Sequence, residues 1–153
     1  MPHLGDQPSW PHVHDLEVRE DYPSAIDALE ARLAIDPDDH EAVRRLGFNL
    51  WYAVIEQMRM GKELPVEEYA RRFMDLYRAY ASRLAGDADF CWAFGLGMSM
   101  FWYNFPGATE EEGNRLLERA RQLDPMWASL HEHGTDLSRL RGRGIFQSYY
   151  NVG

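Results

Sequence analysis

The sequence predicts an all-α protein in which about six antiparallel helices stack in pairs around one very apolar helix. Three observations lead to this prediction. Residues 90–105, FCWAFGLGMSMFWYNF, contain no charged side chain, so a helix there must be covered on every side. Several other segments space their apolar residues three and four apart, which is the period of an amphipathic helix. Short turns separate these segments, and no alternating strand pattern interrupts them.

The first two helices are bounded by prolines and capping residues. The first starts near Pro23, which suits a first helical turn, and stops at Asp36-Pro37 because the residue before proline avoids helical geometry. The second follows Asp38, a candidate cap, and Glu41 stands three residues later as in a capping box. We expect Gly61 to end this helix.

Proline and glycine also mark the third helix and the central one. Pro65 opens the third helix, and the central apolar helix follows Gly86 and closes at the Phe-Pro-Gly turn of residues 105–107. The small residues inside the apolar stretch let neighbouring helices approach closely. The inward faces of the second and third helices are expected to comprise Val43, Leu46, Leu50, Val54, Met58, Tyr69, Phe73, Leu76, Tyr80 and Leu84.

The last two helices are predicted from a capping box and a second Asp-Pro stop. Thr109 and Glu112 have the spacing of a capping box, and the fifth helix that they begin halts at Asp124-Pro125. A sixth helix is expected over residues 127–140, although Gly134 weakens it by about 1 kcal/mol relative to alanine.

Composition divides the chain into three parts. Residues 1–21 carry Pro2, Pro8 and Pro11 without a helical period, so we expect an extended N-terminal arm. Residues 22–141 form the helical-repeat domain. Residues 142–153, GRGIFQSYYNVG, show no helical period and form a basic and aromatic tail that we expect to pack on or near that domain.

Charge limits the class of partner. The chain has 153 residues, enough for one domain with its own core, and a formal charge of −9. Nucleic-acid binders need a basic face to neutralise phosphates, so this acidity argues against that class. Residues 1–138 hold 13 basic and 25 acidic side chains, or −12, whereas residues 139–153 hold three arginines and no acid, or +3. An acidic body therefore ends in a short basic segment.

Other features point to a cytoplasmic chain. Cys91 is the single cysteine, so there is no intrachain disulfide and a reducing compartment fits. The first 15 residues lack the charged start and apolar middle of an export signal. The apolar stretch is shorter than the roughly 20 residues of a membrane span. Gly97-Met98-Ser99 resembles the start of a nucleophile turn, but Phe101 replaces its second glycine and no strand precedes it.

The two Asp-Pro stops lie in an internal repeat. Residues 24–48 align with residues 112–134, proline on proline. The pattern resembles the tetratricopeptide repeat, in which a small residue, a large one four positions later and a closing proline mark the second helix. The matching positions are Ala25, Leu29 and Pro37, then Gly113, Leu117, Ala120 and Pro125, with Leu46-Gly47 matching the family's Leu-Gly pair.

The resemblance covers residues 22–140 and implies helix pairs whose concave surface binds a peptide or protein. In that family the first helix of each pair lines the groove. Carried onto this sequence, those positions are Arg44, Phe48, Trp51, Tyr52, Phe94, Met98 and Phe101. The tail adds Arg141, Arg143, Tyr149 and Tyr150 as candidate partner-binding residues. The alternatives are that the aromatic residues form a closed core, or that the tail itself fills the groove.

Metal and acid–base chemistry receive little support from the sequence. His131 and His133 lie two residues apart, so on a helix they point in different directions and do not share one ion. His12 and His14 fall in the predicted arm. The clusters of Asp36–Glu41 and Glu110–Glu112 are explained by helix capping. We therefore expect no catalytic residue, no metal and no cofactor.

The leading functional hypothesis is a non-enzymatic protein-binding module. Its sharpest form is a small bacterial immunity protein, an antitoxin that blocks a folded and basic toxin or secreted effector, because acidic surfaces suit basic targets. A secretion-type chaperone or adaptor that binds an extended peptide is the alternative in the same class. A metal-dependent enzyme would need two of His12, His14, Asp15, His131 and His133 to converge in a cleft. No nucleic acid or membrane partner is expected, and the chain is a monomer or a dimer.

Overall fold

The fold is all-α, as the sequence predicts. A computed structural model describes residues 7–60, 63–125, 144–145 and 148. Over these residues no strand is present. In chain order the elements are α1 (Trp10–Val18), α2 (Tyr22–Ile35), α3 (His40–Met60), α4 (Val66–Tyr80), α5 (Ala88–Phe101), the 3-10 helix η2 (Trp102–Asn104) and α6 (Glu110–Leu123).

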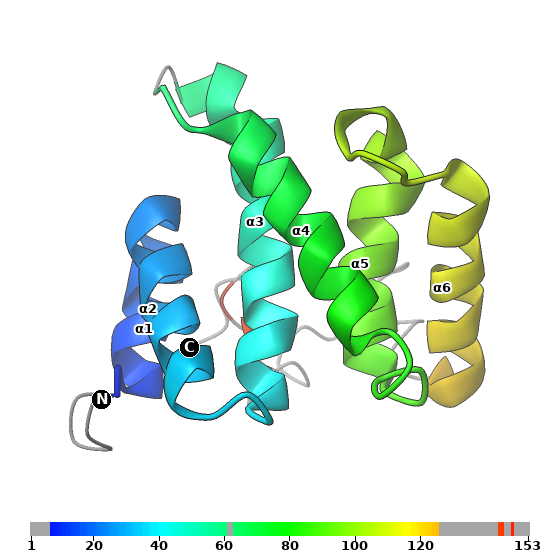
Figure 1. The fold of residues 1–153 in the computed structure, drawn as a ribbon, viewed down its shortest axis with the longest axis horizontal. Coiled ribbons are helices and arrows are strands. Elements are labelled where there is room, and N and C mark those ends of the chain that lie inside the picture. Colours follow the sequence, from blue (N-terminus) through cyan, green and yellow to red (C-terminus); the bar gives the residue numbers. More distant parts are fainter. Residues whose placement is uncertain (1–6, 61–62, 126–143, 146–147, 149–153) are drawn as a thin grey trace.

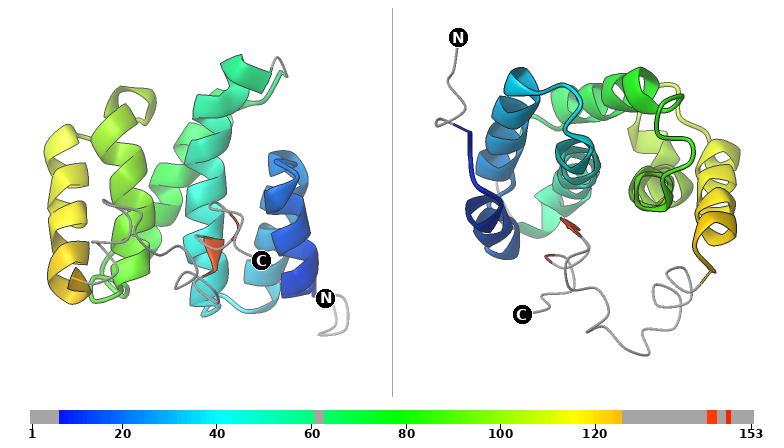
Figure 2. Two further views of the ribbon diagram at one scale, coloured as in Figure 1. Left: turned by 180° about the vertical axis from the view of Figure 1, so that it is seen from behind. Right: turned by 90° about the horizontal axis from the view of Figure 1, so that it is seen from below.

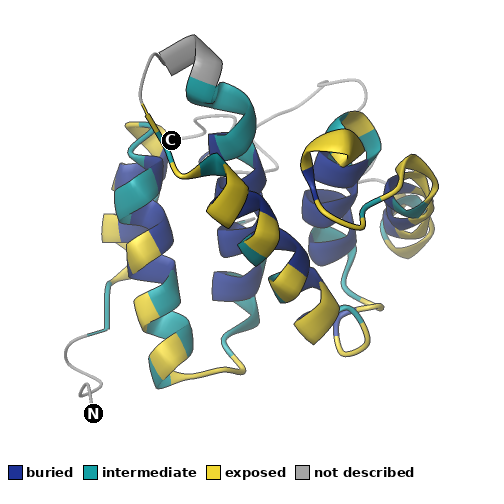
Figure 3. Cartoon of the chain, turned by 45° about the horizontal axis from the view of Figure 1, so that its top comes forward, coloured by how far each residue is buried: buried dark blue, intermediate teal, exposed yellow. Residues whose placement is uncertain are grey.

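The helices stack side by side in chain order (Figure 1). α3 packs against α2, α4 and α5, and α5 makes its most extensive contact with α6. Seen from below, the helices follow an arc, and the described residues of the C-terminal segment lie on its inner side, near α3 (Figure 2). Buried residues gather on the faces that meet, while the outer faces are exposed (Figure 3). The packing is that of a stacked helical bundle.

Proline and aspartate set the helix boundaries largely as expected. α2 begins with Pro23 in its first turn and is followed by Asp36 as its C-cap. Pro65 is the N-cap residue of α4. Thr109 caps α6, its hydroxyl accepting from the amide of Glu112 at 3.1 Å, and the helix ends before Asp124.

Two boundary predictions need correction. The cap of α3 is Asp39 and not Asp38, because it is Asp39 whose carboxylate accepts from the amide of Ala42 at 3.1 Å. The arm predicted over residues 1–21 is not extended throughout, since residues 10–18 form α1. Ser9 caps this helix and Pro11 sits in its first turn, where a missing N–H costs nothing.

Phe94 of α5 stands at the centre of an aromatic core. Its ring centroid lies 4.5 Å from that of Phe90 and 4.9 Å from that of Phe73 on α4. Gly47 of α3 makes room for this ring, because a Cβ there would lie 2.3 Å from the Phe94 Cζ atom. Gly97 makes similar room for Trp51. The small residues therefore do let the helices approach closely.

The apolar helix is not covered along its whole length, and this corrects the prediction. The residues from Phe90 to Gly95 are all buried. The α-helix stops at Phe101, and the remaining apolar residues continue into η2, where Trp102 and Tyr103 are exposed. Among the described helices, none combines the length and the apolarity that a bilayer crossing requires. The predicted sixth helix falls outside the described residues.

Candidate functional site

Four residues of the predicted groove are buried in the core. Phe48, Trp51, Phe94 and Met98 retain at most 3% of their surface, so they line no open surface. Trp51 is fixed between helices, since it packs against Gly97 and lies 4.8 Å from the ring of Phe48. The prediction that these four bind a partner is corrected: they hold α3 against α5. In the sequence, aromatic residues at helical spacing have the same pattern whether they form a buried core or line an open groove.

The other described groove residues are partly buried. Arg44 pairs with Glu41 at 3.0 Å and with Asp87 at 2.6 Å, tying α3 to the turn before α5. Burial lowers the Arg44 pKa, but the charges of Asp87 and Glu41 outweigh it and raise the pKa overall. Tyr52 and Phe101 contact Tyr22 and Trp51, respectively, through their rings. Arg141, Arg143, Tyr149 and Tyr150 lie outside the described residues.

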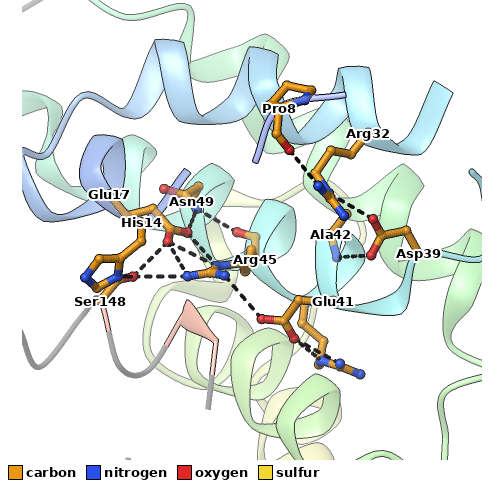
Figure 4. A network of polar contacts seen from close by, with 11 residues as sticks. Pro8, His14, Glu17, Arg32, Asp39, Glu41, Ala42, Arg45, Asn49 and Ser148 are labelled. Carbon is orange, nitrogen blue, oxygen red and sulfur yellow. Dashed lines mark hydrogen bonds and ion pairs between the residues drawn. The ribbon is translucent and has the colours of Figure 1, made fainter. Parts of the chain in front are cut away.

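A buried ion pair joins α1 to α3 (Figure 4). The side chains of Glu17 and Arg45 are 2% and 7% exposed, and Arg45 Nη2 lies 2.9 Å from Glu17 Oε1. Asn49, fully buried, donates from Nδ2 to Glu17 Oε2 at 2.8 Å and to the Arg45 carbonyl oxygen at 2.8 Å. A buried pair is favourable only with such additional hydrogen bonds. No local sequence pattern predicts this ion pair, because Glu17 and Arg45 lie 28 residues apart.

Ser148, from the C-terminal segment, completes this polar cluster. Its hydroxyl donates to Glu17 Oε1 at 2.8 Å and accepts from Arg45 Nη2 at 3.2 Å. His14 Nδ1 lies 2.6 Å from the same oxygen (Figure 4). Ile145 is 4% exposed and lies beside Tyr22, Phe48 and Tyr52. The described part of the C-terminal segment therefore sits against α1 and α3, where a peptide ligand was expected.

The histidines do not form a metal centre where they are described. His12 is exposed, and His14 contacts Ser148. No group of three or more His, Cys, Asp or Glu side chains in the described part of the chain could hold an ion. His131 and His133 lie outside it.

Three of the five large hydrophobic residues that are exposed in the described part of the chain lie at the end of α5. We call Met100, Trp102 and Tyr103 the α5-end cluster; they are 51%, 41% and 66% exposed. The two aromatic rings meet edge to face, with centroids 5.7 Å apart. Beside them a hollow of about 260 Å3 is lined by Trp102, Thr109, Glu110 and Glu111. The sequence does not predict this exposed surface. An unbroken apolar run does not show which of its residues the neighbouring helices cover.

A second group of perturbed side chains joins α4 to α6. The Tyr77 hydroxyl donates to Glu112, and Arg115 also donates to that carboxylate. Burial and the bond to Glu112 raise the pKa of Tyr77. Burial raises the Glu112 pKa, but hydrogen bonds from Arg115 and Tyr77 outweigh it, so this pKa lies below its ordinary value. Burial also raises the pKa of nearby Cys91 to about 11, which makes it a poor nucleophile at neutral pH.

Comparison with protein-family models, with curated proteins and with solved structures finds no match.

Proposed function

We propose that this chain is a non-enzymatic protein-binding module that recognises its partner through the α5-end cluster. The observation that carries the proposal is the exposure of Met100, Trp102 and Tyr103 within four consecutive residues. The other large hydrophobic residues exposed in the described chain, Val18 and Leu123, stand apart from it in sequence and are each 37% exposed. Contiguous exposed apolar surface of this kind marks interaction sites.

Aromatic residues suit this role for a physical reason. Tryptophan and tyrosine are enriched among the residues that contribute most to binding energy, since each buries a large rigid surface and keeps one polar atom for a hydrogen bond. Trp102 and Tyr103 already support each other edge to face, so little side-chain freedom remains to be lost on binding. The adjoining hollow beside Trp102 offers room for one partner side chain.

The charge of the chain indicates a basic partner. Glu110 and Glu111 are exposed beside the cluster, and the formal charge is −9. Acidic surfaces steer basic proteins toward them and raise the association rate. A folded basic toxin or effector that the chain neutralises, as an immunity protein does, has this chemistry.

A folded partner is favoured over an extended peptide. A chaperone for extended segments would need a long open groove, and the burial of Phe48 and Trp51 removes the apolar floor of the predicted one. The α5-end cluster is confined to four consecutive residues, which suits docking against a folded partner.

The test is co-purification of the full chain with its native partner, followed by isothermal titration with the purified pair. We expect nanomolar binding to a folded and basic protein. The double substitution Trp102→Ala and Tyr103→Ala should weaken binding by about 100-fold or more, because two central aromatic contacts are lost.

The matched control is the double substitution Val18→Ala and Leu123→Ala, which removes exposed apolar side chains elsewhere on the surface. This variant should bind like the original chain. Equal binding by the Trp102/Tyr103 variant would refute the proposed surface. Binding that requires an unfolded partner would establish the chaperone alternative instead.

A further inference from the structure

A cavity of about 280 Å3 lies at the end of α5 opposite to the α5-end cluster. The end of α4 and the turn that follows it, the first turn of α5 and the middle of α6 surround it. The lining residues are Tyr77, Ala81, Ser82, Ala85, Phe90, Cys91, Arg115, Leu116 and Arg119.

The walls of the cavity are largely apolar. Phe90, Cys91 and Leu116 are buried and form part of the lining. The volume falls just below the range of roughly 300–1,000 Å3 that is usual for small-molecule pockets. An occupant must therefore be small, with one compact apolar group.

Two arginines give the cavity its charge. Arg115 is neutralised by Glu112, to which it donates. Arg119 is exposed and donates from Nε to the carbonyl oxygen of Ala85 at 3.2 Å, which places its guanidinium beside the cavity. Among the described side chains, no carboxylate forms an ion pair with Arg119. Its positive charge is thus available to a ligand.

We propose that this cavity binds a small organic anion, in which one carboxylate pairs with Arg119 and an aromatic or branched aliphatic body packs on Phe90 and Leu116. Guanidinium and carboxylate match in charge and in the spacing of their hydrogen-bonding atoms. The perturbed pKa values of Tyr77 and Cys91, both on the lining, agree with this location, since such groups cluster at functional sites. The site is separate from the protein-binding surface proposed above.

Benzoate is the probe, and benzamide, which has the same shape without the charge, is its neutral counterpart. Isothermal titration of the full chain should show saturable benzoate binding at concentrations up to about 10 mM, as expected for so few atoms. Benzamide should bind about tenfold more weakly, because a charge-assisted hydrogen bond is stronger than a neutral one.

Arg119→Gln should weaken benzoate binding by about fivefold, and Arg119→Lys should recover part of the loss because the charge returns. Arg71→Gln is the matched control: it removes an arginine from α4 that is 63% exposed and does not line the cavity. In amide NMR spectra, benzoate should shift Phe90 and Cys91 and leave Trp102 unchanged.

The proposal is overturned if benzoate fails to bind, if benzamide binds equally well, or if the shifted amides lie away from the cavity. It is also overturned if Arg119→Gln and Arg119→Lys both bind like the original chain. Should Arg119→Gln fail to fold, the comparison of the two probes on the original chain decides the question.

Discussion

Gly113 of α6 lies against Ser99 of α5 so closely that a Cβ on Gly113 would stand 2.2 Å from the Ser99 amide nitrogen. The same atom would lie 2.6 Å from the carbonyl carbon of Met98. Both neighbours are backbone atoms of a helix, so neither can rotate away as a side chain would. Glycine at this position sets how closely the two helices pack.

We predict that Gly113→Ala destabilises the protein by about 2 kcal/mol or more, because the helices must separate to admit the methyl group. Urea unfolding monitored by circular dichroism measures the change. Gly86→Ala is the matched control, since nothing lies within 4 Å of a Cβ there, and it should leave stability almost unchanged. Equal stability of the two variants would contradict the close helix contact.

The buried ion pair between α1 and α3 predicts a large loss of stability from the substitution of one partner. Glu17→Gln should cost about 3 kcal/mol, because the charge of Arg45 stays buried without its partner. Asp15→Asn, which breaks a pair with Arg19 that is 59% and 61% exposed, should cost about 0.5 kcal/mol or less. Thermal unfolding measures the loss of stability in both variants. Similar losses would contradict the prediction.

The cap of α3 can be assigned by comparing two adjacent aspartates. Asp39→Ala should cost about 2 kcal/mol, since it removes the bond to the Ala42 amide and the 2.9 Å contact with Arg32. Asp38→Ala should cost about 0.5 kcal/mol or less, because its pair with Arg83 is largely exposed. The reverse order in chemical denaturation would restore Asp38 as the cap.

Stability should fall in acid partly through Glu112. Its pKa in the folded state is below the ordinary 4.5, so the unfolded chain takes up the proton first as the pH falls. The stabilisation is therefore present above pH 4.5 and lost as the pH falls through the folded-state pKa. Glu112→Gln should flatten this part of the profile of unfolding free energy against pH. If the variant and the original chain give parallel profiles, protonation of Glu112 is not linked to folding.

The pKa of Cys91 shifts in the opposite direction, so its contribution to stability is lost at alkaline pH. Its pKa rises from 9.0 to about 11 on folding, so the unfolded chain loses the proton first as the pH rises. The contribution is complete below pH 9 and disappears between pH 9 and about 11. Cys91→Ala should lose less stability over this interval than the original chain, as measured by urea unfolding at several pH values. A steeper loss in the variant would be the contrary result.

Most helices could be predicted because their signals are local. Pro23, Pro65 and Thr109 mark helix starts through backbone geometry and a hydrogen bond within three residues. The Asp-Pro stops work in the same way. The sequence does not predict α1 because proline usually interrupts a helix, whereas Pro11 lies in the first turn, where proline is compatible with one.

The surface depends on contacts that no local pattern encodes. Phe48 and Trp51 are aromatic residues at helical spacing, and only the neighbouring α5 decides that they are buried. Ser148 reaches Glu17 across 131 residues. The exposure of Trp102 likewise depends on which helices extend far enough to cover it, which hydrophobicity alone does not determine.

The side chains at the two ends of α5 differ in how strongly packing constrains them. From Phe90 to Phe94 every side chain is buried, so a substitution there would disturb the packing of the neighbouring helices. At Met100, and at Trp102 and Tyr103 just beyond the helix, side chains can be exchanged with little penalty to folding. If the α5-end cluster binds the partner as proposed, a library that randomises only these three positions should yield folded proteins with altered partner preference, and the scaffold would then suit engineered recognition.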